Sequence, residues 1–363
     1  MSSPEHAGLP QRAADKSAVV IRPGALNVAL VGAGRMAAVH ARSIHRHAHA
    51  HLCVIVDPTV EARQALASVH AASTASTLDE AFTSHRIDAV VIASPSETHA
   101  DYIEACAKAG LPVLCEKPVD LSLDRVDRCL RSVAGTDVPI VIGFHRRFDA
   151  PRAEIREWAR NGTLGTLRQV TQISRDPRLP GAMFLAHSGG MVRDMLIHDL
   201  DELIWLVGDG PVTVFAELRR SADELAAIGD HDLASISISF ERGPQCSIFA
   251  SRQCEYGFDQ RLEVFGTRGM ASCPSMHASM ALRAGHDGFL QARLLDHFPE
   301  RYAEAYRAEF DHFVRVARGE EASRCTVQDA RLSLALAEMA LSSHRSGLPV
   351  RASTLTDFSG PTG

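Results

Sequence analysis

The first half of the chain alternates between short apolar runs and segments with helical periodicity. After the opening run Val28–Val31 and its helical segment, the apolar runs cover residues 52–58, 88–94, 112–118 and 138–144. Helical patterns between them cover residues 98–110 and 122–135. Strands that alternate with helices predict βαβ units and a parallel sheet.

The second half has a different pattern, in which short strand-like segments follow one another. These segments cover residues 166–175, 211–219, 233–243, 245–254 and 260–269. Between Ser235 and Phe240, serine alternates with Ile or Phe at every position. This period of two predicts a sheet with one buried face and one more polar face. A length of 363 residues fits two domains of these two kinds.

Composition and charge limit the kinds of partner and compartment that are expected. The net charge is −6 and the chain has no long basic run, so a nucleic-acid partner is not expected. No apolar stretch approaches the roughly 20 residues of a membrane span, and residues 1–26 lack the apolar run of a signal peptide and look like a tail. None of the eight cysteines forms a C-x-x-C pair, which favours free thiols in a reducing cytoplasm.

A glycine motif follows the first predicted strand. Gly32, Gly34 and Ala37 fit the pattern G-x-G-x-x-A between a strand and a helix, which predicts a tight turn that lets a pyrophosphate approach the helix N-terminus. Asp57 ends the next strand, 25 positions after Gly32. A carboxylate there binds ribose hydroxyls and repels the extra phosphate of NADP, so NAD is the expected cofactor.

Ligands of parallel sheets bind at the carboxyl ends of the strands. That rule brings Gly32 and Asp57 to the same edge as Ser94–Pro95 and Glu116–Lys117–Pro118.

The stretch MVRDMLIHDLDEL, residues 191–203, is largely apolar at helical spacing but contains Asp194, His198 and Asp201. Positions i, i+4 and i+7 lie on one helical stripe. A carboxylate and an imidazole on one stripe indicate acid–base chemistry or a metal site, and the stretch alone does not decide between them.

The motif E-K-P at the end of a Rossmann strand resembles that of the Gfo/Idh/MocA oxidoreductase family. The resemblance spans nearly the whole chain after residue 26, and within the family it is greatest to bacterial inositol 2-dehydrogenases. Besides CEKPVDLS, it is carried by SPSETHADYIEACAKAGLPVLCEKP, GFHRRFD, SRDP, SGGMVRDMLIHDLDELIWLVGD, YGFDQRLEVFGTRGM and ERYAEAYRAEFDHF.

The resemblance implies an α/β fold with an N-terminal Rossmann domain and a C-terminal α/β domain whose open sheet is mostly antiparallel. We expect a tail at 1–26, the NAD-binding domain at 27–146, and a substrate and oligomerisation domain at 147–353 with C-terminal helices packing back, then a tail at 354–363. Family members commonly form dimers and tetramers through the outer face of that sheet, so a homotetramer or homodimer is expected.

The resemblance also implies site residues. It assigns catalysis to Lys117, Asp194 and His198. The lysine binds the reacting oxygen, the aspartate forms a hydrogen bond with the substrate, and the histidine is the general base. Expected cofactor-binding residues are Gly32, Gly34, Arg35, Met36, Asp57, Ser94, Pro95, His99, Glu116 and Lys117. Expected substrate-binding residues are Arg147, Ser174, Asp176, Asp194, His198, Asp201 and Tyr256.

The implied activity is NAD-dependent oxidation of a secondary alcohol of a cyclitol, with myo-inositol as the first candidate, in the cytoplasm. Alternatives are another inositol isomer, a pyranose sugar, or a sensor of the same fold that binds without turnover; NAD-assisted glycoside hydrolysis ranks lower. No metal is expected, because no cysteine accompanies Asp194 and His198 and Lys117 already supplies a positive charge.

Overall fold

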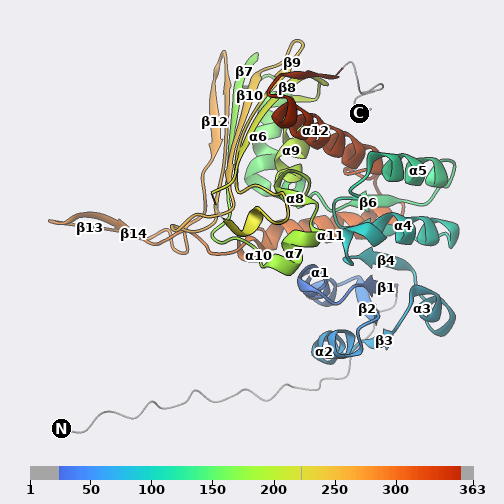
Figure 1. Ribbon diagram of the computed structural model, residues 1–363. Helices are drawn as coiled ribbons and strands as arrows, with labels where there is room; N and C mark the ends of the chain where they lie inside the picture. Colours follow the sequence, from blue (N-terminus) through green and yellow to red (C-terminus); the bar gives the residue numbers. More distant parts are fainter. Residues whose placement is uncertain (1–23, 222, 353–363) are drawn as a thin grey trace, which may run out of the picture.

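The computed structural model describes residues 24–221 and 223–352, arranged as two sheets with helices packed against them (Figure 1). The expected tails therefore lie outside the described residues, apart from residues 24–26. Within the described residues, no helix is long and apolar enough to cross a membrane. All eight cysteines are free, and seven of them are buried.

The first sheet has six parallel strands in the order β3-β2-β1-β4-β5-β6. Its strands are β1 (Leu26–Val31), β2 (Ala50–Val56), β3 (Ser73–Ala75), β4 (Ala89–Ile92), β5 (Val113–Cys115) and β6 (Ile140–Ile142). Its helices are α1 (Arg35–Arg46), α2 (Val60–His70), α3 (Leu78–Ser84), η1 (Ser96–Thr98), α4 (His99–Lys108) and α5 (Leu123–Val133). The central strands are apolar on both faces because helices cover both, as expected for a parallel sheet.

The second sheet has seven strands in the order β12-β11-β7-β10-β9-β8-β15. Only the pair β7–β10 is parallel; the other pairs are antiparallel. The strands are β7 (Leu167–Arg175), β8 (Pro211–Arg219), β9 (Leu233–Phe240), β10 (Gln245–Ser251), β11 (Asp259–Gly266), β12 (Gly269–Cys273) and β15 (Val350–Arg351). In β9 the isoleucines are buried and the serines exposed, which confirms the alternation expected from the sequence.

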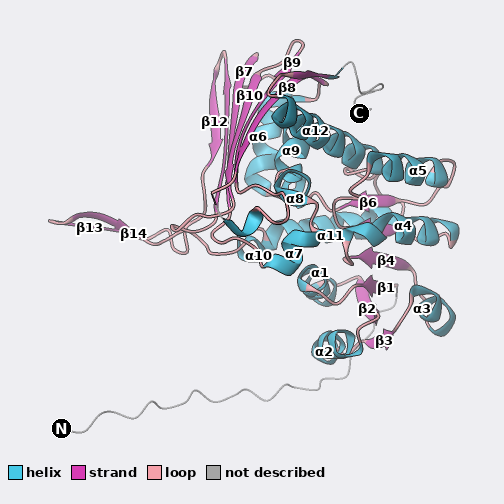
Figure 2. Cartoon of the chain, in the orientation of Figure 1, coloured by secondary structure: helices cyan, strands magenta, loops and turns pink. Residues whose placement is uncertain are grey.

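The remaining elements connect or cover the sheets (Figure 2). They are η2 (His145–Phe148), α6 (Ala150–Arg160), α7 (Ala182–His187), α8 (Gly190–Asp194), α9 (Ile197–Val207), η3 (Asp223–Leu225), α10 (Phe298–Arg301), α11 (Ala303–Ala317) and α12 (Val327–Ser346). The strands β13 (Leu282–Gly285) and β14 (Gly288–Gln291) form a hairpin that projects from the body (Figure 1).

Each sheet has its own apolar core; α11 contributes to the first core, and α12 contributes to both. Phe310 and Phe313 of α11 and Leu334 of α12 are buried in the first core, among the strands of the parallel sheet. Leu336 and Met339 of the same helix belong to the second core. The C-terminal helices therefore join the two halves of the molecule.

Candidate active site

The glycine loop after β1 is shaped by close backbone packing. Gly32 has φ +102°, and a β-carbon there would lie 2.5 Å from the carbonyl oxygen of Ala93. Gly34 differs, because a β-carbon there would meet nothing within 4 Å. Because Gly32 has no β-carbon, the loop after β1 can pack closely against the backbone that follows β4. Because Gly34 has none, its backbone stays accessible from the space in front of α1.

The loop suits a dinucleotide diphosphate. Gly34 is the N-cap of α1, whose first turn contains no acidic residue, so its free N–H groups and positive dipole end favour an anion. Arg35 is exposed at the first helical position, with its guanidinium 5.0 Å from the centre of the Phe298 ring. Met36, the next residue, is half-buried.

Asp57 stands at the end of β2, beside this loop. Its Oδ2 accepts a hydrogen bond from the backbone N–H of Ala33 at 2.8 Å, and its Oδ1 accepts one from Thr59 at 2.8 Å. The carboxylate is thereby fixed next to the glycine turn, where ribose recognition requires it.

His99 lies at the start of α4 and is buried. Its Nδ1 is 2.7 Å from the carbonyl oxygen of Pro118, and its Nε2 is 2.8 Å from that of Ser94. Both ring nitrogens therefore lie within hydrogen-bond distance of backbone carbonyl groups, and the expected contact of His99 with the cofactor stays a prediction. The ring connects two loops: the loop after β4, which contains Ser94 and Pro95, and the loop after β5, which contains Pro118.

Glu116 is also turned inward. Its Oε1 is 2.7 Å from Nε2 of His40, and its Oε2 accepts a bond from the backbone N–H of Lys117 at 3.3 Å. The carboxylate is buried and anchors the loop, and the expected contact of Glu116 with the cofactor stays a prediction. The following Lys117–Pro118 peptide bond is cis.

Lys117 reaches from this loop to the second domain. Its Nζ donates to the backbone oxygen of Asp194 at 2.6 Å and to the Asp194 carboxylate at 3.0 Å. The other oxygen of that carboxylate is 3.8 Å from the guanidinium of Arg252. The structure thus joins two predicted catalytic residues that are 77 positions apart.

His198 is half-buried, and its Nδ1 is a buried atom with no hydrogen-bond partner. Burial, and then the charge of Lys117, hold the pKa of His198 well below 6.5, so the ring is neutral at neutral pH. Asp176 is near as well: burial, and then the charge of Asp194, raise its pKa to about 6.

The single helix expected over residues 191–203 is two helices, since α8 ends at Asp194 and α9 begins at Ile197. Asp201 consequently faces away from the candidate site. Its carboxylate accepts two bonds from Arg147, at 2.9 and 2.5 Å, and both residues are buried. Arg147 also donates to Asp329, so the two groups pair within the protein, and their expected contact with substrate stays a prediction.

Arg146, the neighbour of Arg147, is the arginine near the site. Its buried guanidinium donates to Asp199 at 2.7 Å, to Gln260 at 2.7 Å and to Ser174 at 3.2 Å. Ser174 also donates to Gln260 at 2.8 Å, so its hydroxyl belongs to this network rather than to a free substrate surface. Because Arg146 and Arg147 are adjacent in HRRF, the sequence alone does not show which of them lies near the site.

Tyr256 is 51% exposed, and its hydroxyl donates to Asp259 at 2.7 Å. The structure places it beside Arg175 and Asp259, not with Lys117, Asp194 and His198. Its expected contact with substrate stays a prediction. Among residues 24–221 and 223–352, no group of three or more His, Cys, Asp or Glu side chains is arranged to hold a metal ion.

Comparison with known proteins adds independent findings. Residues 26–144 match the model of an oxidoreductase family with an NAD-binding Rossmann fold, and residues 153–272 match the GFO/IDH/MocA C-terminal domain. An inositol 2-dehydrogenase of Rhizobium meliloti is 37% identical over 86% of this chain and 95% of its own length.

Two further similar proteins are also named as inositol dehydrogenases. A scyllo-inositol 2-dehydrogenase (NAD(+)) of Bacillus subtilis is 33% identical over 76% of this chain and 80% of its own length. The crystal structure of a myo-inositol dehydrogenase from Corynebacterium glutamicum superposes with a TM-score of 0.86 at 35% identity, covering 90% of this chain and 98% of that one.

Proposed function

This chain belongs to the Gfo/Idh/MocA oxidoreductase family, and from that premise we propose that it oxidises one secondary alcohol of a cyclitol, with myo-inositol as the favoured substrate and its 2-keto derivative as product. The observation that carries the proposal is the contact of Lys117, at the carboxyl edge of the parallel sheet, with Asp194. His198 is close enough for the charge of Lys117 to lower its pKa. The relatives named for inositol oxidation support the choice of substrate.

Each of the three residues has a defined task in this proposal. His198 is neutral, so it accepts the hydroxyl proton as general base. The ammonium of Lys117 stabilises the negative charge that develops on the substrate oxygen. Asp194 holds Lys117 in place through two contacts, and its carboxylate offers an acceptor for a second hydroxyl.

NAD fits the residues that the glycine loop presents, and when bound it supplies a hydride acceptor. Gly32, Gly34 and the N-terminus of α1 hold the diphosphate, and Asp57 holds the ribose. The carboxylate also disfavours the 2′-phosphate of NADP.

A cyclitol requires several polar partners, because buried hydroxyls that remain unpaired are costly. Asp176, Asp194 and His198 provide them near Lys117. Other inositol isomers or a pyranose sugar are the second choice of substrate. A sensor without turnover is disfavoured, because both Lys117 and His198 are retained.

The test is NADH absorbance at 340 nm after mixing the protein and NAD with myo-inositol, scyllo-inositol or glucose. We expect turnover of an inositol, and loss of turnover in His198→Asn, which keeps a polar side chain but no base. Binding of NAD without turnover of any polyol would favour the sensor.

We also propose a homotetramer or homodimer in the cytoplasm. The outer face of the second sheet exposes Phe215, Phe249 and Phe265 by 41 to 46%, which supports association through that face. The free thiols support a reducing compartment. Analytical ultracentrifugation tests the assembly, and a monomer at micromolar concentration would contradict it.

A further inference from the structure

A buried arginine of the second domain lies beside the carboxylate of Asp194. Arg252 directly follows β10 and is 1% exposed. Its Nη2 is 3.8 Å from Oδ2 of Asp194, which is within the reach of an ion pair but longer than a hydrogen bond. The other carboxylate oxygen, Oδ1, accepts the hydrogen bond from Lys117. Asp194 therefore lies between two cations, one from each domain.

The position of Arg252 is fixed by Asp230. Nη1 of Arg252 donates to Oδ2 of Asp230 at 2.7 Å, and both side chains are buried. Oδ1 of Asp230 accepts a hydrogen bond from the backbone N–H of Met191 at 2.9 Å, in the first turn of α8, the helix that ends at Asp194. Asp230 therefore holds both the helix that carries Asp194 and the arginine that faces it.

Nη2 of Arg252 is the unused part of this arrangement. It is a buried atom without a hydrogen-bond partner, whereas most buried polar side-chain atoms in native proteins have one. A movement of about 1 Å would bring it from 3.8 Å to hydrogen-bond distance of Oδ2 of Asp194. The guanidinium is thus anchored through one nitrogen and directed at Asp194 through the other.

We propose that Arg252 is a positioning residue, which holds Asp194 through Oδ2 while Lys117 turns its ammonium from Asp194 to the substrate oxygen; the proposal rests on the function proposed above. The developing alkoxide requires that ammonium, so the contact between Lys117 and Asp194 weakens as the substrate reacts. A charge-assisted hydrogen bond from Arg252 then keeps the carboxylate in place. No proton or electron passes through Arg252, which acts only through Asp194.

A second carboxylate increases the need for this cation. Asp176 follows β7, and burial, and then the charge of Asp194, raise its pKa to about 6. Asp199 acts in the same direction, whereas the charges of Arg252 and Arg146 lower this pKa. Loss of Arg252 would therefore leave the two carboxylates at the site in stronger repulsion, and one of them would take up a proton at a higher pH.

Two substitutions of Arg252 test the role by kinetics. Arg252→Met keeps an apolar stem and removes the charge, and it should lower kcat by about 10- to 100-fold, the scale of a slightly misplaced catalytic group, with unchanged affinity for NAD. Arg252→Lys keeps the charge and should lose less. A wild-type kcat in Arg252→Met, or a lysine variant no better than the methionine variant, would overturn the proposal.

The pH profile separates positioning from a general loss of stability. In Arg252→Met, the decline of kcat/KM on the acid side should lie about one pH unit above that of wild type, since an opposite charge within about 4–6 Å shifts a carboxyl pKa by that much or more. A protonated Asp194 no longer attracts Lys117, which explains the loss of activity. A merely structural role would lower kcat without moving the acid limb, and that result would contradict the proposal.

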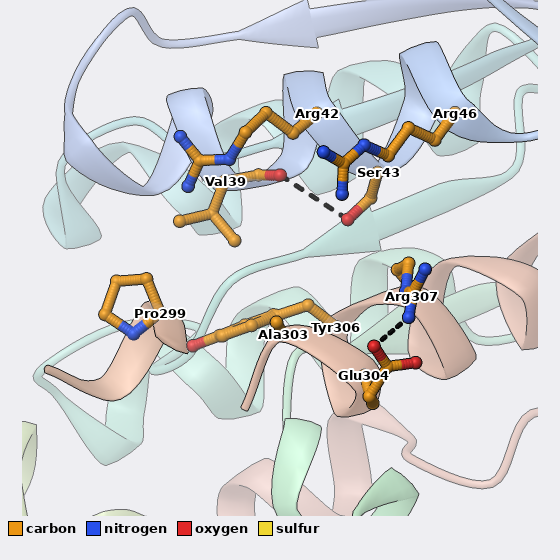
Figure 3. Close-up of a pocket in the computed structure, with 9 residues that line it drawn as sticks. All are labelled: Val39, Arg42, Ser43, Arg46, Pro299, Ala303, Glu304, Tyr306 and Arg307. Carbon is orange, nitrogen blue, oxygen red and sulfur yellow. Dashed lines mark hydrogen bonds and ion pairs between the residues drawn. The ribbon is translucent and has the colours of Figure 1, made fainter. Parts of the chain in front are cut away.

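Three further variants serve as controls. Asp230→Asn keeps an acceptor for Met191 but removes the carboxylate that anchors Arg252, so kcat should fall in the same direction. If Arg252→Met does not fold because it leaves Asp230 buried without a cation, the double variant Arg252→Met/Asp230→Asn removes both charges and carries the same prediction. Arg307→Met makes the same change at an ion pair with Glu304, where both residues line a hollow between α1 and α11 (Figure 3), and should leave kcat and the acid limb at wild-type values.

A readout without turnover separates this proposal from the proposed function. In protein labelled with ¹³C-aspartate, the carboxyl signal of Asp176, assigned with Asp176→Asn, should titrate at higher pH in Arg252→Met than in wild type. If no cyclitol is turned over but this midpoint moves, the proposed function fails and the action of Arg252 on the carboxylates stands. If the midpoint stays the same and kcat is normal in Arg252→Met, the positioning role fails and the proposed function stands.

Discussion

Substitution of the two glycines of the first loop by alanine should have different effects: the change at Gly32 should lower stability, and the change at Gly34 should lower the affinity for NAD. Gly32→Ala places a β-carbon 2.5 Å from the Ala93 carbonyl oxygen, at a φ of +102°. The positive φ costs about 1–2 kcal/mol, and overpacking against backbone costs about 1–3 kcal/mol. We therefore expect a loss of about 2–5 kcal/mol in the free energy of unfolding.

Gly34→Ala is the matched control for stability. The added β-carbon meets no protein atom within 4 Å, and the residue has φ −85°. The free energy of unfolding should therefore stay within about 0.5 kcal/mol of wild type, as for surface substitutions. Affinity for NAD should nevertheless fall, because the methyl group occupies the space that the diphosphate approaches.

Urea unfolding followed by circular dichroism measures the first effect, and calorimetric titration with NAD measures the second. With an unfolding entropy of about 2.1 cal/mol/K per residue, a chain of 363 residues loses about 1.3 °C per kcal/mol, so Gly32→Ala should also melt about 3–7 °C below wild type. Wild-type stability in Gly32→Ala would refute the packing argument. Wild-type NAD affinity in Gly34→Ala would place the diphosphate elsewhere.

Three further outcomes follow from the site. Lys117→Ala should lower kcat about 100-fold or more, because the developing alkoxide loses its cation; a wild-type rate in the NADH assay would defeat that role. Asp57→Ser should relax the preference for NAD over NADP, and an unchanged ratio of the two kcat/KM values would place Asp57 outside the ribose site. Because the pKa of His198 is held well below 6.5, the base stays neutral as pH falls through 6.5. The kcat/KM for alcohol oxidation should therefore decline only at lower pH, and a His198-dependent inflection near 6.5 would contradict the neutral, desolvated ring.

The architecture was largely predictable because its signals are local. Apolar runs followed by helical periodicity located the parallel sheet, and the alternation Ser235–Phe240 located a strand with one exposed face. The glycine motif and Asp57 were found for the same reason, since their spacing reflects a single strand–turn–helix unit.

The side-chain partners were less predictable, because they depend on contacts between distant segments. Nothing near Arg147 in the sequence indicates that Asp201 and Asp329 neutralise it, or that Arg146 faces the other way. His99 has the sequence position of a cofactor ligand, but two carbonyl groups occupy its ring. The break between Asp194 and Ile197 was hidden by an apolar pattern that continues through it.

The contribution of α11 and α12 to the first core bears on how the chain is made. Phe310, Phe313 and Leu334 fill space beneath strands that are translated near the start of the chain. At about 5–20 residues per second, the ribosome needs on the order of ten seconds or more to reach them after β6 is complete. The nucleotide-binding half therefore emerges with an open apolar surface and closes only when synthesis is nearly finished, so a ribosome that stalls before α11 leaves a fragment for chaperones or proteases.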